Sequence, residues 1–354
     1  MQKIMKHLYV TLFDKGFTNR GLALHASLIR YAPQPFQLYI LCVDEESHAL
    51  LTKLALPRVT LVSRVEFEQK EPAIAATKKT RTLEEYCWTL GSGFTQHVMK
   101  NYTDPGDASQ LVIYVDADLY FYSSVQPIFD LFGNNSTLII PHNHPENRRH
   151  KEKDVGKYNV GMVIFRNDDD GRACLTWWSD KCIEWCYARV EPDRFGDQKY
   201  LDFFEEKFKG VYILTHKGSN LAPWCIGNFK DKIYRKNGVV MIDDVPLIFF
   251  HFSSFKIYFL PSPFRVSIAK TAHNYGKPTF IKRLIYNQYR NELYKAMKTI
   301  RMIQPDFIAG TIQRTGISDE LKTVAFPLWW WAFKDLIRPF LQPIINIFRP
   351  RKAV

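Results

Sequence analysis

The 354-residue sequence predicts an α/β fold with a mostly parallel central sheet flanked by helices. Three observations support this prediction. Apolar, β-branched runs alternate with helical patterns along the first 250 or so residues, as in βαβ units. Hydrophobic residues make up 46% of the chain and charged residues 24%, which is enough apolar material for a packed core. The run at 111–115 ends directly in two aspartates, and open α/β sheets bind ligands at such strand ends.

Each expected strand is a short apolar run that ends in turn-forming or polar residues. The expected strands cover residues 8–13, 36–43, 59–62, 111–115, 138–141, 158–165, 211–214 and 245–252. Each expected helix shows apolar residues three or four positions apart. The expected helices cover residues 19–31, 45–54, 78–102 with a break near 91–93, 170–190, 197–208 and 281–302. The polar stretch at 142–154 predicts a mobile, solvated loop over the ligand site, with His142 and His144 in solvent. The alternative is that these two histidines bind a metal, but no carboxylate or third imidazole stands at ligand spacing.

The positive charge is concentrated near the C-terminus. Residues 261–354 carry 16 Lys and Arg against 5 Asp and Glu, so +11 of the total +12 lies there. Three tryptophans at 329–331 stand among basic residues and prolines, a pattern typical of a segment in a membrane interface. The alternative is that these tryptophans pack on the rest of the protein. We therefore expect one domain over residues 1–260 and a basic, aromatic, helical extension over residues 261–354.

Composition also indicates the compartment. The six cysteines have no CxxC spacing, which predicts reduced, buried thiols. The N-terminal apolar stretch is too short for a signal peptide, and no apolar run reaches the roughly eighteen residues that span a bilayer. We expect a cytoplasmic protein.

The aspartate pair is the strongest local signal. Asp116 and Asp118 are two residues apart at the end of a strand, so both carboxylates can point to one place beyond it. Two carboxylates there suit Mg²⁺ or Mn²⁺, which can in turn hold a diphosphate. A polar turn is the alternative, because D-x-D also occurs by chance. The pair predicts a metal-dependent site for a nucleotide-sugar.

Further motifs follow the aspartate pair in a recognisable order. Asn159-Val-Gly161 opens a later strand, Gly196-Asp197-Gln198 precedes a helix, and His251 ends the last apolar strand. With these motifs, residues 8–257 resemble the GT-A-type glycosyltransferases, and within them the retaining glycogenin-like and bacterial galactosyltransferase group. The family usually has a glycine three residues after the histidine and a lysine six after it. Here Ser254 takes the first place and Lys256 comes one residue early.

The resemblance implies a GT-A-type fold, with a nucleotide-sugar half over about residues 1–120 and an acceptor half over about 121–260. It implies metal ligands for Mn²⁺ or Mg²⁺ at Asp116, Asp118 and His251. The implied donor-binding residues are Thr11, Phe13, Asp14, Arg81, Asp116, Gly161 and Lys256. The implied catalytic residues are Asn159, Asp197 and Gln198. Trp88, Asn220 and Trp224 are hypothetical acceptor contacts.

Asp197 has more than one interpretation. It positions the sugar in a retaining enzyme, serves as the base in an inverting one, or merely caps a helix. The resemblance favours retention of the anomeric configuration.

The expected function is therefore that of a metal-dependent hexosyltransferase. It would move a hexose from a UDP-linked or other nucleotide-sugar to a glycan or lipid-linked acceptor, in polysaccharide or lipopolysaccharide synthesis, at the inner face of the membrane. One alternative is a nucleotidyltransferase of related fold, although no glycine-rich basic signature follows the first strand. Another is a non-enzymatic protein that binds nucleic acid or an anionic surface, suggested by the pI of about 9.3. That alternative leaves the aspartates unexplained, so we expect no nucleic-acid partner.

Overall fold

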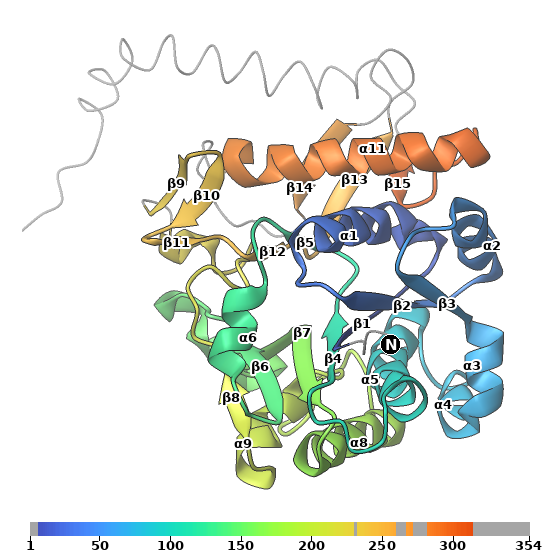
Figure 1. The fold of residues 1–354 in the computed structure, drawn as a ribbon, viewed down its shortest axis with the longest axis vertical. Helices are drawn as coiled ribbons and strands as arrows, with labels where there is room; N and C mark the ends of the chain where they lie inside the picture. Colours follow the sequence, from blue (N-terminus) through green and yellow to red (C-terminus); the bar gives the residue numbers. More distant parts are fainter. Residues whose placement is uncertain (1–5, 230–231, 260–266, 272–281, 314–354) are drawn as a thin grey trace, which may run out of the picture. The chain divides into compact units, whose positions relative to one another are not determined.

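The structure is a computed structural model that describes residues 6–229, 232–259, 267–271 and 282–313. The chain forms two compact units, one of residues 1–254 and 273–310, the other of residues 255–272 and 311–354. A seven-stranded sheet in the order β3-β2-β1-β4-β7-β6-β8 forms the centre of the first unit (Figure 1). Strand β7 runs antiparallel to both of its neighbours, and the other neighbouring pairs are parallel. The predicted α/β fold of GT-A type, with a mostly parallel sheet flanked by helices, is confirmed.

The elements follow the predicted order closely. The sheet strands are β1 His7–Phe13, β2 Phe36–Cys42, β3 Val59–Ser63, β4 Leu111–Val115, β6 Thr137–Pro141, β7 Tyr158–Arg166 and β8 Val211–Ile213. The helices around them are α1 Thr18–Tyr31, α2 Glu45–Leu54, α3 Arg64–Lys70, α4 Pro72–Thr77, α5 Leu83–Tyr102, α6 Gln126–Phe132, α8 Asp169–Glu184 and α9 Phe204–Lys207. Smaller pairings join β12 Phe249–His251 to β5 Leu119–Phe121, and β9 Ile233–Lys236, β10 Val239–Ile242 and β11 Val245–Pro246 to one another.

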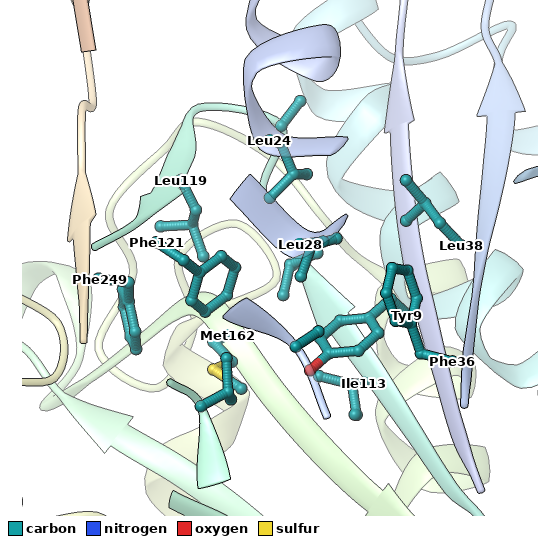
Figure 2. Close-up of a cluster of buried hydrophobic side chains, with 14 of the residues drawn as sticks. Tyr9, Leu24, Leu28, Phe36, Leu38, Ile113, Leu119, Phe121, Met162 and Phe249 are labelled. Atoms are coloured by element: carbon teal, nitrogen blue, oxygen red, sulfur yellow. The ribbon is translucent and has the colours of Figure 1, made fainter. Parts of the chain in front are cut away.

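Two apolar cores cover the two faces of the sheet. Alternation along β1 sends Tyr9 and Phe13 to one core and Leu8, Val10 and Leu12 to the other. The first core is completed by side chains of α1, α2, α6 and α11, and the second by side chains of α5 and α8. Figure 2 shows the first core, where Tyr9 lies among neighbouring side chains of α1, β2 and β4. Burial on both faces explains why these strands are continuous apolar runs.

Several helix boundaries differ from the prediction; for example, the expected helix at 197–208 is a 3-10 turn over Lys199–Phe203 followed by α9. Thr82 and Glu85 form a capping box, so α5 begins at Leu83, five residues after the expected start. The expected break near 91–93 is absent, and α5 is continuous from Leu83 to Tyr102. The two glycines allow close packing instead of breaking the helix. A Cβ on Gly91 would lie 3.2 Å from the Tyr114 ring, and one on Gly93 would lie 2.2 Å from Ile74. Helix α8 ends at Glu184, six residues before the expected end.

The stretch at 142–154 is largely exposed, as predicted, but it is not an irregular loop and its two histidines are buried. It contains a 3-10 turn, η2 Glu146–Lys151, and the short helix α7 Glu152–Val155. His142 and His144 are 5% and 8% exposed, and their rings stack with centroids 4.9 Å apart. The prediction of solvent-exposed histidines was therefore wrong, because tertiary packing buries these two rings, whereas most of the charged residues from 146 to 154 are exposed as predicted.

The basic region contributes a helix to the first unit. A π-helical turn, η5 Lys282–Tyr286, leads into α11 Asn287–Ile303, and α11 packs against α1 (Figure 1). In the second unit, β14 Ser267–Thr271, β13 Phe255–Phe259 and β15 Thr311–Gln313 form a three-stranded sheet. The tryptophan-rich segment at 326–333 lies outside the described residues, and the boundary at residue 260 stays a prediction. Within the described part of the chain, no helix has both the length and the apolar character needed to cross a membrane.

Candidate metal centre

The aspartate pair lies where β4 leaves the sheet. The backbone N–H of Asp116 donates to the carbonyl of Gly161 on β7, which fixes the first residue after the strand. Strand β5 begins after Asp118 and pairs antiparallel with β12, so that His251 lies opposite Leu119. The pairing brings together residues that are more than 130 positions apart in the sequence.

The three expected metal ligands form one cluster. His251 Nε2 lies 3.2 Å from Asp118 Oδ1 and 3.6 Å from Asp116 Oδ2. One ligand atom from each residue lies within 4.8 Å of the other two. Octahedral ligands at about 2.1 Å from a metal are about 3 Å from their neighbours, so this spacing fits Mn²⁺ or Mg²⁺. The mixed set of two carboxylates and one imidazole favours Mn²⁺ over Ca²⁺.

The electrostatics of the cluster suit a divalent cation. Burial raises the pKa of the Asp116 carboxyl, although His251 acts in the opposite direction. Burial also acts to raise the pKa of Asp118, but the neighbouring His251 outweighs it and holds that pKa below its usual value. For His251 burial favours the neutral ring, and the attraction of Asp118 outweighs it to raise the pKa. A divalent cation would replace the imidazole proton as the counter-charge of the two carboxylates.

Asn159 and Gly161 support the histidine ligand. Asn159 Oδ1 accepts a hydrogen bond from the backbone N–H of Gly161 at 2.9 Å and lies 3.3 Å from His251 Nδ1. An Nδ1–H that donates to Asn159 leaves Nε2 as the metal-binding nitrogen. A Cβ on Gly161 would lie 2.6 Å from Asn159 Oδ1 and 2.8 Å from His251 Nδ1, so the position has room only for glycine.

Tyr114 is a contact that sequence reasoning missed. Its hydroxyl donates a hydrogen bond of 2.8 Å to Asp116 Oδ1, and the ring is almost fully buried. The signal was present in the sequence, because Tyr114 stands two residues before Asp116 and therefore on the same face of β4.

Asp197 is buried close to this cluster. Burial and the neighbouring charge of Asp116 raise the pKa of Asp197 to about 8. The backbone carbonyl of Asp197 accepts a hydrogen bond from the indole N–H of Trp178 at 2.8 Å. The next residue, Gln198, donates to the backbone carbonyl of Val155 at 2.7 Å. Asp197 is thus placed near the metal ligands, while the Gln198 amide is bonded to the end of α7.

A cavity lies beyond the ends of β1 and β2. It has a volume of about 360 Å³ and is lined by residues that include Asp14, Asp44 and Arg81. The expected donor residues Asp14 and Arg81 are thereby brought together. Thr11 is fully buried, and Phe13 packs against Gly21 of α1, so neither is among the residues that line this cavity. Lys256 belongs to the second unit.

The hypothetical acceptor residues divide between two places. The Trp224 ring lies 5.3 Å from the His251 ring, and its N–H donates to the carbonyl of His142. Asn220 is buried and donates to the carbonyl of Pro141 at the end of β6. Trp88 instead lies against Gly196, where a Cβ would approach the indole to 3.2 Å.

The sheet order, with the D-x-D pair and a histidine at its edge, defines the GT-A-type class of α/β fold. No protein-family model matches the sequence. The chain belongs to the family of two Bacillus subtilis (strain 168) proteins, YfnF and YfnD, both named as uncharacterized. It is 30% identical to YfnF over 309 residues, which is 86% of this chain and 97% of YfnF. It is 32% identical to YfnD over 292 residues, which is 80% of this chain and 88% of YfnD.

Solved structures similar to the chain are glycosyltransferases. An active-site mutant of LgtC has 16% identity and a TM-score of 0.49, over 80% of this chain and 95% of LgtC. The galactosyltransferase LgtC in complex with donor and acceptor sugar analogs has a TM-score of 0.47 and 16% identity, over 81% and 95% of the two chains. Mouse xyloside xylosyltransferase 1 has a TM-score of 0.45 and 15% identity, over 71% and 98%.

Proposed function

We propose that this protein is a metal-dependent glycosyltransferase that moves a hexose from a UDP-linked sugar to a glycan or lipid-linked acceptor. The observation that carries the proposal is the Asp116, Asp118 and His251 cluster at the carboxyl edge of β4. Two buried carboxylates and an imidazole at this edge are suited to hold a divalent cation beside a diphosphate. A bound cation supplies positive charge where the leaving diphosphate develops negative charge.

The cavity at the end of β1 supports a nucleotide donor. It lies at the same edge of the sheet as the metal ligands, and its 360 Å³ has about the size of a small-ligand site. Its lining combines the carboxylates of Asp14 and Asp44 with the cations of Arg64, Lys78 and Arg81. Carboxylates accept from ribose or base N–H and O–H groups, and the cations suit phosphate oxygens.

The protonation of Asp197 supports retention of the anomeric configuration. An inverting transferase needs an ionised base against the acceptor hydroxyl. Burial and the charge of Asp116 raise the pKa of Asp197 to about 8, which disfavours the ionised form that a base needs. In the proposed reaction Asp197 and Gln198 orient hydroxyls of the transferred sugar, and Asn159 holds His251 in its metal-binding tautomer.

Thermal unfolding with UDP, with and without Mn²⁺, tests the proposal. For the wild type we expect UDP with Mn²⁺ to raise the Tm well above the effect of either alone. Asp118→Ala should lose the combined shift, and the exposed Asp180→Ala is the matched control that should keep it. A wild type that shows no shift with UDP and Mn²⁺ would remove the basis of the transferase proposal, and a nucleic-acid binder would give this result.

Attachment to the inner face of a membrane, as part of polysaccharide or lipopolysaccharide synthesis, is the second part of the proposal. Helix α11 exposes Arg290, Tyr294, Lys295 and Lys298 on the side opposite its buried face. Basic residues beside an aromatic ring suit a surface of anionic lipids. Deletion of residues 328–354 should strongly weaken sedimentation with anionic liposomes, with the basic face of α11 as the remaining contact, and should preserve the UDP–Mn²⁺ shift. Unchanged sedimentation would contradict the docking role of the tail.

A further inference from the structure

Lys199 is a buried lysine that the proposed reaction does not use. It directly follows Asp197 and Gln198, and only 5% of its surface is exposed. Its ammonium donates to the backbone carbonyls of Lys153, of Asp154 at 3.4 Å and of Glu191 at 3.1 Å. An ammonium has three N–H donors, and each has a carbonyl here. Such a buried charge is tolerated only when it is fully hydrogen-bonded.

The carbonyls that Lys199 binds belong to the end of a helix. Lys153, Asp154 and Val155 form the last turn of α7, whose carbonyls have no partners within the helix. Lys199 donates to the carbonyls of Lys153 and Asp154, and Gln198 donates to the carbonyl of Val155 at 2.7 Å. A cation at a helix C-terminus is also favoured by the helix dipole. The two consecutive side chains therefore cap α7 from outside.

The same residues connect α7 to both sides of the candidate site. The backbone of Gly156 packs against Lys199, where a Cβ would lie 3.1 Å from the Lys199 Cα. Residues 142–155 begin at His142, whose carbonyl binds Trp224 next to the metal ligand His251. They end at Val155, whose carbonyl accepts a hydrogen bond from Gln198, the residue after Asp197. Lys199 thus lies at the junction between this segment and the Asp197–Gln198 turn.

We propose that Lys199 is a positioning residue that holds segment 142–155 against the Asp197–Gln198 turn. The inference rests on the proposed function at one point, the contact of Gln198 with the transferred sugar. When the Gln198 amide turns to a sugar hydroxyl, it leaves the carbonyl of Val155. Lys199 is then the side chain that keeps α7 in place and preserves the position of Asp197.

Limited trypsin digestion tests the clamp without relying on any activity. The segment carries cleavage sites at Arg148, Arg149, Lys151 and Lys153. In Lys199→Met we expect cleavage within 148–153 to accelerate at least about tenfold, because charged hydrogen bonds that close the segment are lost. Lys53→Met, on the exposed face of α2, is the matched control and should be cleaved like the wild type. Lys199→Gln keeps two N–H donors, so trypsin should cleave it at a rate between those of the wild type and Lys199→Met. It replaces Lys199→Met in the test if that variant does not fold.

Two further measurements separate this inference from the proposed function. Lys199→Met should keep the UDP–Mn²⁺ thermal shift, because the clamp does not touch the metal ligands. Its turnover in the hydrolysis of UDP-glucose or UDP-galactose should fall at least about tenfold, with the affinity for UDP unchanged. Equal trypsin rates for wild type, Lys199→Met and Lys199→Gln would overturn the clamp. Faster cleavage of the variants, in a protein whose wild type shows no UDP–Mn²⁺ shift, would contradict only the proposed function.

Discussion

Tyr114 acts on the metal centre through a single hydrogen bond. Its hydroxyl donates to Asp116 Oδ1 at 2.8 Å in a buried environment. This bond favours the ionised form of Asp116 and partly offsets the burial that raises the pKa of that carboxyl. Metal binding requires the ionised carboxylate, so Tyr114 supports the affinity for the cation without being a ligand itself.

We therefore expect Tyr114→Phe to weaken Mn²⁺ binding about tenfold, the lower end of such supporting effects. The loss should be larger at pH 6 than at pH 8, because Asp116 without its donor takes up a proton more readily. Calorimetric titration with Mn²⁺ in the presence of UDP measures this. Tyr234→Phe is the control, since Tyr234 is 43% exposed on β9. Equal affinities for wild type and Tyr114→Phe at both pH values would contradict the role of the hydroxyl.

Strand β7 shows how one element serves two purposes. Its apolar residues complete the core between β4 and β6, while Asn159 and Gly161, near the start of the strand, support the site. The sequence predicted this strand at 158–165, with Asn159 and Gly161 near its start, and the observed strand is Tyr158–Arg166. That Asn159 faces His251 depends on the antiparallel insertion of β7 between β4 and β6, which no local pattern encodes.

Gly161→Ala tests this arrangement. The added methyl group would collide with Asn159 and His251, so we expect the free energy of unfolding to fall by about 1–3 kcal/mol. The Mn²⁺-dependent shift with UDP should also be lost, because His251 must move. Gly227→Ala is a matched control with nothing within 4 Å of the added Cβ. Urea unfolding with Mn²⁺ titration measures both effects, and a Gly161→Ala protein that behaves like Gly227→Ala would refute this close packing.

At the scale of the whole molecule, burial of histidines makes stability depend on pH. Burial lowers the pKa of His7 to about 4, and its ring stacks on Phe129 with centroids 4.5 Å apart. Burial also lowers the pKa of His25. The folded protein then binds these protons less readily than the unfolded chain. Their stabilising contribution is present above pH 6.5 and is lost as the pH falls toward 4.

His7→Phe should flatten this dependence. The stacking on Phe129 remains while the titrating group is removed, so the slope of unfolding free energy between pH 6.5 and 4 should fall by up to about 1.4 kcal/mol per pH unit. Urea unfolding at several pH values measures the slope. The exposed His150→Phe serves as the control. An identical slope in wild type and His7→Phe would show that His7 takes up its proton at the same pH in the folded and the unfolded protein.

Much of the molecule could be predicted from the sequence because its signals are local. Short apolar runs between helical patterns predicted the seven strands of the central sheet. Helix α2 was predicted at 45–54, as observed. The D-x-D spacing placed two carboxylates at one strand end, which follows from the two-residue repeat of a strand. The roles of Asn159, Asp197 and Gln198 in catalysis stay predictions.

Only the tertiary structure decided which distant residues meet. The pairing of β12 with β5 brings His251 to Asp118, and the packing of α11 on α1 places Met297 within 3.5 Å of Asn19. Other long-range contacts bury His142 and His144, for which the polar neighbours predicted exposure, and surround the Lys199 ammonium with three carbonyls. The local pattern determines helix, strand and the residues at a strand end, because those depend on neighbours in the chain. Contacts between segments a hundred residues apart depend on strand order and crossover, and these are set by how the whole chain packs.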